Sequence, residues 1–145
     1  MDIQNSFTQT FNTPATILVR APGRVNLLGE HVDYNDGVVL PAAIDRAVRL
    51  AASPTQDGIV RLYAQDLGQQ VAFRLDALEQ RVDLDGAPLP HWAIYPAGVA
   101  WALREAGVQV RGMQAVYTSD VPIGAGLSSS AAVEVAFAAA WRALG

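Results

Sequence analysis

The stretch Val121-Pro-Ile-Gly-Ala-Gly-Leu-Ser-Ser-Ser-Ala-Ala132 lies between a predicted strand and a predicted helix. The strand covers residues 113–119, and the helix runs from the serines to about Leu144. Gly124 and Gly126 allow the backbone to bend close to a ligand, because glycine has no Cβ atom. Free N–H groups and the positive end of the helix dipole lie beside such a turn. The pattern therefore predicts a site for phosphate oxygens.

Three consecutive hydroxyls, on Ser128, Ser129 and Ser130, strengthen this prediction. A hydroxyl at the start of such a helix can also ligate Mg²⁺. A plain strand-to-helix turn with a serine cap needs one serine and at most one glycine, so this stretch exceeds it. The dinucleotide-binding fingerprint fits less well, since it needs a third glycine where Ser129 stands. The chain has no lysine, which excludes the P-loop signature.

A second stretch, Arg20-Ala-Pro-Gly-Arg-Val-Asn-Leu-Leu-Gly-Glu-His-Val-Asp-Tyr-Asn35, concentrates charged side chains between glycines. It is expected to be too irregular for a strand or a helix. Its polar side chains can donate to and accept from a polyhydroxylated molecule; they are Arg24, Glu30, His31 and Asp33. Two other interpretations remain open at this point, a solvated polar loop and a mixed metal site on Glu30, His31 and Asp33.

Composition narrows the class of protein. The 145 residues are 51% hydrophobic, which is ample for the core of one domain covering residues 1–145. The net charge is −4 and the arginines are scattered singly, so nucleic acid is not an expected partner. Residues 1–7 lack the features of a secretory signal, and no apolar run approaches the roughly 18 residues of a membrane span. A cytoplasmic location without membrane contact is expected.

Periodicity and turn residues predict mostly strands first and helices later, an α+β order. Helices are expected over residues 3–12 and 91–106, with one helical turn at 76–81. The expected strands cover residues 16–21, 38–43, 47–52, 59–64 and 71–75.

The last predicted helix is apolar on nearly every side, since only Glu134 and Arg142 carry charge between Ala131 and Leu144. Such a helix should be buried on several sides, so Glu134 is expected to be a paired or functional buried carboxylate, or to face a missing segment. No segment follows it here, so the expectation is a truncated domain that associates with itself through this helix.

Together the two stretches resemble the galactokinase family, within the superfamily of homoserine, mevalonate and phosphomevalonate kinases. The residues Gly23-Arg-Val-Asn-Leu-Leu-Gly-Glu-His-Val-Asp-Tyr34 are similar to the family's signature, and residues 122–131 are similar to the superfamily's phosphate loop. Residues 91–99 are similar to a helix that runs beside the adenine. The fold implied is the N-terminal domain of the galactokinase and mevalonate kinase type, similar to a domain of a small-subunit ribosomal protein.

The resemblance also implies roles. Glu30, His31, Val32 and Asp33 would bind the sugar, and Arg24 would stabilise the transferring phosphoryl group. Trp92 would pack against the adenine. The ATP phosphates would be bound by the phosphate loop, with Ser130 also ligating Mg²⁺; its residues are Gly124, Ala125, Gly126, Leu127, Ser128, Ser129 and Ser130.

The implied activity of the complete protein is transfer of the γ-phosphoryl group of ATP to the anomeric hydroxyl of galactose. The implied partners are galactose and MgATP. The family's catalytic aspartate lies on a later segment, so this chain alone is expected to be inactive. Three alternatives stay open: a kinase for a related sugar such as N-acetylgalactosamine or arabinose, a non-catalytic sensor of sugar and ATP, and a split product that only binds.

Overall fold

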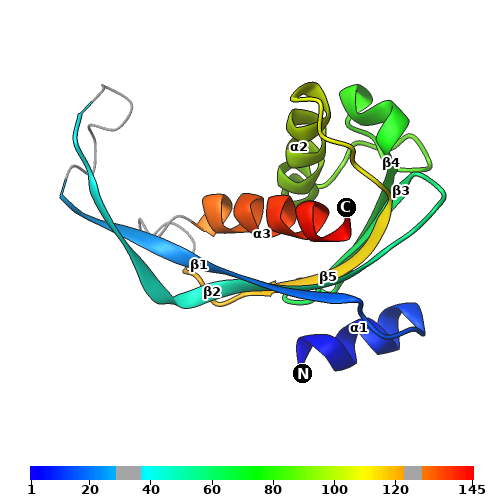
Figure 1. Cartoon of the computed structure of the whole chain (residues 1–145). Helices are drawn as coiled ribbons and strands as arrows, with labels where there is room; N and C mark the ends of the chain where they lie inside the picture. The colour runs from blue at the N-terminus through cyan, green and yellow to red at the C-terminus, as the bar shows by residue number, and fades with distance from the viewer. Residues whose placement is uncertain (29–36, 123–128) are drawn as a thin grey trace.

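A five-stranded mixed sheet carries the fold (Figure 1). The computed structural model describes residues 1–28, 37–122 and 129–145. The strands lie in the order β1-β2-β5-β3-β4, with β3 parallel to β5 and the other neighbouring pairs antiparallel. The strands are β1 (Ile17–Leu28), β2 (Leu40–Pro54), β3 (Ile59–Ala64), β4 (Gln69–Arg74) and β5 (Met113–Ser119).

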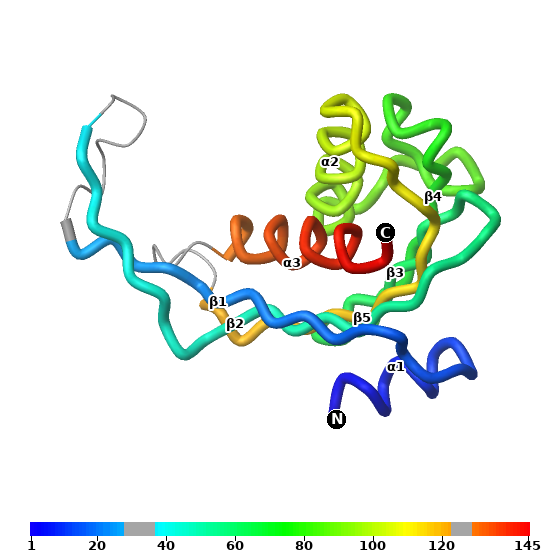
Figure 2. The backbone as a smooth tube through the Cα atoms, in the orientation of Figure 1, coloured from blue at the N-terminus to red at the C-terminus, as the bar shows by residue number. Residues whose placement is uncertain are grey.

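Helices cover both faces of this sheet. Helix α1 (Ile3–Phe11) lies on one face, and α2 (His91–Glu105) and α3 (Ser129–Leu144) lie on the other (Figures 1 and 2). A short 3-10 helix, η2 (Leu75–Gln80), follows β4. Within the described residues, no helix is long and apolar enough to cross a membrane. The layers confirm the α+β class predicted from the sequence.

The central strand β5 is buried from both faces. Met113, Ala115 and Tyr117 belong to the main core cluster, shared with α2 and α3. Val116 points the other way and packs in a smaller cluster with Phe7 of α1. This alternation follows the period of a strand whose two faces are both covered.

Helix α3 packs closely because its inward face is small. Ala132, Ala136 and Ala140 recur every four residues and are all buried, so the helix backbone can approach β1 and β2. Phe137 and Trp141 fill the space beside this stripe. The indole Nε1 of Trp141 donates to the carbonyl of Arg111 at 2.9 Å, which satisfies the buried N–H.

The expectation for the outer side of α3 was wrong in one respect. Glu134 is exposed, so it is not a buried carboxylate. Val135 is 57% exposed and lines an apolar groove. The groove is also lined by Leu103 of α2 and by Val108 in the loop after α2. Among the described residues α3 therefore buries one face. The predicted self-association stays a prediction.

The irregular loop expected from Arg20 onward was also wrong for its first part. Residues 20–28 continue β1, and β2 is one strand where two were expected. Pairing shifts register between Pro22 and Arg24, so the residues between Ala43 and Ala47 bulge from β2. β1 is an edge strand, which tolerates a proline without an N–H. Both strands extend beyond the first turn of α3 (Figure 2).

Replacing Gly112 with alanine should lower the free energy of unfolding. A Cβ atom there would lie 2.7 Å from the carbonyl oxygen of Ile59 and would also meet Thr55, so backbone would have to move. We expect a loss of about 1 to 3 kcal/mol in urea unfolding. Gly98→Ala is the matched control, because a Cβ there meets nothing within 4 Å and α2 should gain about 0.5 to 1 kcal/mol. Equal effects of both variants would contradict this account.

Self-association through the outer side of α3 is testable with one substitution. Val135→Glu keeps a helix-forming residue and places a charge in the apolar groove. We expect the weight-average mass in sedimentation to rise with concentration for the native chain and to rise less for Val135→Glu. A native chain that stays monomeric at all concentrations would refute the prediction.

Candidate functional site

The structure describes four of the predicted site residues. Arg24 lies on β1, Trp92 at the start of α2, and Ser129 and Ser130 in the first turn of α3. The others lie outside the described residues: Glu30, His31, Val32, Asp33, Gly124, Ala125, Gly126, Leu127 and Ser128.

Arg24 lies just past the register shift of β1. It is exposed, whereas its neighbour Gly23 is buried, and it pairs across the ladder with Ala43 of β2. Bulges are frequent next to functional sites because they redirect a side chain. Arg24 is thus an exposed residue of a strand, and a guanidinium carries five N–H donors that can bind an anion.

The first turn of α3 presents two hydroxyls. Ser129 is half-buried and Ser130 is exposed. α3 is 16 residues long, so its dipole favours negative charge at this end. The helix packs against β1 and β2, which places this turn beside the strand that carries Arg24. The two elements with predicted phosphate-binding residues are therefore neighbours.

Trp92 is half-buried and tied in place from two sides. Its Nε1 donates to the side-chain oxygen of Gln69 at 2.8 Å. Its ring centre lies 6.1 Å from that of Tyr117, which lies 5.5 Å from that of Phe137. This row of aromatic rings connects α2 through β5 to α3. The described hydrogen bonds link Trp92 to β4 and do not link it to Arg24 or Ser130.

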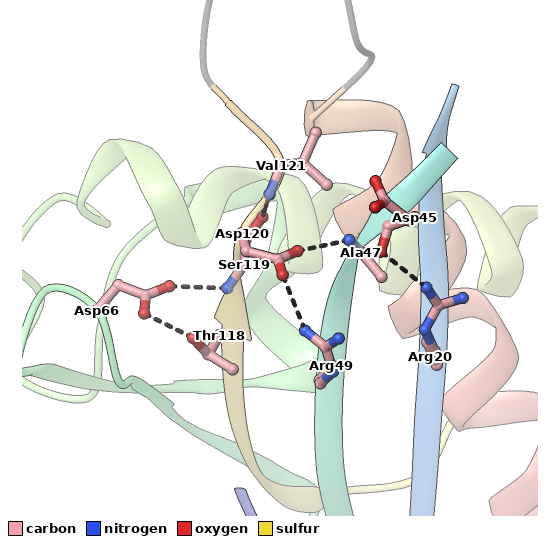
Figure 3. Close-up of polar contacts among 9 residues, drawn as sticks. All are labelled: Arg20, Asp45, Ala47, Arg49, Asp66, Thr118, Ser119, Asp120 and Val121. Carbon is pink, nitrogen blue, oxygen red and sulfur yellow. Dashed lines mark hydrogen bonds and ion pairs between the residues drawn. The ribbon is translucent and has the colours of Figure 1, made fainter. Parts of the chain in front are cut away.

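The end of β5 carries a polar network that the sequence did not predict (Figure 3). Asp120 accepts from the backbone N–H of Ala47 at 2.6 Å and from Arg49 at 3.3 Å. Asp66 accepts from Thr118 and from the backbone N–H of Ser119. Both aspartates sit in turn-like sequence, where acidic residues are common, so no local pattern singled them out.

Charge and burial shift two pKa values in this network. The N–H of Ala47, followed by the Arg49 guanidinium, holds the pKa of the Asp120 carboxyl below its usual range. Burial, followed by the negative charge of Asp66, raises the pKa of Tyr117 to about 12. Asp120 is therefore ionised and Tyr117 neutral at physiological pH.

The raised pKa of Tyr117 predicts a late step in an absorbance titration of the four tyrosines. The neutral form is favoured in the folded state, so this stabilisation is present below the ordinary pKa of about 10 and is lost as the pH rises through about 12. Tyr117→Phe should remove the step, and Asp66→Asn should move it part of the way down because burial remains. A step that persists in Tyr117→Phe would disprove the assignment.

One described hydroxyl, that of Ser130, is a candidate ligand for a Mg²⁺ ion. In the described ranges, no group of three or more His, Cys, Asp or Glu side chains is placed to hold a metal ion. Mg²⁺ commonly takes one or two protein oxygens and completes its shell with waters and substrate phosphates. The exposed hydroxyl of Ser130 is a suitable protein oxygen.

Comparison with known proteins agrees with this arrangement. The chain is 47% identical over 143 residues to a galactokinase of Roseiflexus sp., covering 99% of this chain and 35% of that protein. It is 50% identical over 125 residues to a galactokinase of Streptomyces coelicolor, covering 86% and 31%. The chain is thus similar to one part of these galactokinases. It spans about a third of the length of these relatives.

Family models and a solved structure support the same assignment. Residues 5–54 match the galactokinase galactose-binding signature, and residues 95–145 match the N-terminal domain of the GHMP kinases. The crystal structure of Lactococcus lactis galactokinase complexed with galactose is 31% identical, with a TM-score of 0.79, over 92% of this chain and 34% of that one. The resemblance and the N-terminal domain fold predicted from the motifs are confirmed.

Proposed function

We propose that this domain binds galactose and MgATP in a galactokinase that forms galactose 1-phosphate. The observation that carries the proposal is the match of residues 5–54 to the galactose-binding signature, since this range contains Arg24 and the segment from Glu30 to Asp33. The relative from Lactococcus lactis is described in complex with galactose.

The reaction moves the γ-phosphoryl group. Its bond to the β-phosphate oxygen breaks, a bond to the anomeric oxygen forms, and the anomeric hydroxyl gives its proton to a base. Such transfers depend on positioning and on stabilising charge on the transferring group. Arg24, exposed on β1 beside α3, supplies that charge in this proposal.

The nucleotide end of the site belongs to the first turn of α3. Its N–H groups and the hydroxyls of Ser129 and Ser130 contact the phosphates. Trp92 lies against the adenine ring of ATP. Ser130 would provide one oxygen to Mg²⁺, which would supply positive charge at the phosphates. The sugar end belongs to Glu30, His31, Val32 and Asp33, whose carboxylates and imidazole hydrogen-bond the hydroxyls.

Two substitutions should separate the two ends of the site. Asp33→Asn keeps the shape but loses charge-assisted hydrogen bonds, so galactose affinity should fall by about 10- to 100-fold. Ser130→Ala removes a phosphate and metal contact, so MgATP affinity should fall instead. Calorimetry with galactose alone and with MgATP alone measures the two affinities. If each variant weakens both ligands equally, or Asp33→Asn leaves galactose binding intact, the assignment of the two ends is wrong.

The choice of sugar is tested on a protein of the relatives' length that contains this domain. ADP release should be fastest with galactose when galactose, N-acetylgalactosamine and arabinose are compared. A faster rate with either other sugar would replace galactose as the substrate. Binding of sugar and ATP without ADP release would favour the non-catalytic sensor.

A further inference from the structure

The end of β5 is fixed from both sides by aspartate side chains (Figure 3). On the β2 side, the Asp120 carboxylate accepts from the N–H of Ala47 at 2.6 Å, while the N–H of Asp120 donates to the carbonyl of Ala47 at 3.2 Å. Arg49 adds a contact to the same carboxylate at 3.3 Å. Both backbone groups of Ala47 are thus engaged by one residue of the outgoing chain.

On the β3–β4 side, Asp66 binds the same short segment. One carboxylate oxygen accepts from the hydroxyl of Thr118 at 2.5 Å, and the other accepts from the N–H of Ser119 at 2.7 Å. The hydroxyl of Ser119 in turn accepts from the N–H of Val121 at 3.2 Å. Three successive N–H groups, at 119, 120 and 121, therefore have partners before the chain enters the glycine-rich stretch.

Global stability is a poor explanation for the ion pair in this attachment. The side chains of Asp120 and Arg49 are 40% and 42% exposed, and ion pairs so exposed contribute little to stability. β5 is already anchored by its pairing with β2 and β3 and by burial on both faces. The carboxylates act where that pairing ends, on the last residues before the predicted phosphate-binding stretch.

We propose that Asp66 and Asp120 are positioning residues for the nucleotide. By holding residues 118–121 from two sides, they fix the direction in which the chain leaves β5 toward the first turn of α3, where Ser129 and Ser130 lie. The inference rests on the proposed function, because it assumes that the first turn of α3 binds the ATP phosphates. Neither aspartate touches a reacting group.

The chain contains a matched control at the opposite end of the sheet. Asp57 accepts from the N–H of Ile59 at 3.1 Å and from Arg61 at 2.7 Å, the same kinds of partner that Asp120 has, and also from the hydroxyl of Thr55 at 3.0 Å. Its side chain is 45% exposed. It lies before β3, away from the outgoing end of β5, so Asp57→Ala removes equivalent bonds without touching the proposed attachment.

Hydrogen exchange on the ligand-free chain tests the attachment itself. Asp66→Ala and Asp120→Ala should speed exchange in peptides covering residues 118–131 and leave α1 and β4 as they are. Asp120→Asn keeps an acceptor for the N–H of Ala47 and should restore part of the protection. Asp57→Ala should act only near residues 55–61. Unchanged exchange at 118–131 in both alanine variants would overturn the inference whatever the ligand.

Calorimetry tests the consequence for the nucleotide. Misplacement of phosphate-binding groups should weaken MgATP binding about 10-fold or more in Asp66→Ala and Asp120→Ala, with galactose binding unchanged and Asp120→Asn intermediate. A purely structural role predicts instead that Asp57→Ala and Asp120→Ala lower the unfolding midpoint alike and leave MgATP affinity unchanged. That result would overturn the inference.

Failure of the proposed function gives a different pattern. A native chain that does not bind MgATP overturns the nucleotide assignment and the positioning role with it, while the exchange data still show whether the aspartates hold the end of β5. A native chain that binds MgATP, with variants that bind it equally well, overturns the positioning role alone.

Discussion

Burial of β5 on both faces is the constraint on which the other parts of this domain depend. The strand pairs with β2 on one side and β3 on the other, while α1 covers Val116 and α3 covers the opposite face. A strand so enclosed has little freedom to shift its register, because a slip of one residue would exchange its two faces. The chain that follows β5 therefore starts from a fixed position, and α3 packs on the same sheet.

The sequence predicted the elements whose signals are local. The strands at 59–64 and 113–119 match β3 and β5, and the helix at 91–106 matches α2 almost to its ends. Turn residues mark the ends of these short strands. Pro90 and Gly107 likewise mark the two ends of the helix. β1 was ended too early, because Pro22 and Gly23 look like breaks unless the strand is known to lie at an edge, and β2 was divided where residues 44–46 bulge.

In the candidate site, too, the residues with local sequence signals were predicted and the others were not. Arg24, Trp92, Ser129 and Ser130 were found because they belong to continuous motifs. The side chains that bond to these segments come from far along the chain: Gln69 accepts from Trp92, Asp66 accepts from Thr118, and Asp120 accepts from Ala47. Single turn-like aspartates and one glutamine carry no periodic or spacing signal. Their role becomes visible only when the sheet order brings the segments together.

This separation between motif and support has a physical reason. A residue that contacts a ligand must be of a particular chemical type, so it leaves a pattern in the sequence. A residue that fixes the backbone needs only an acceptor at the right place, and many turn residues can provide one. In this domain most of the predicted ligand-binding residues belong to the two glycine-rich stretches, whereas Asp66 lies in the turn between β3 and β4 and Asp120 directly follows β5. Precision at the phosphates would then depend on two exposed carboxylates, Asp66 and Asp120, whose hydrogen bonds lie at the end of the strand from which the chain departs.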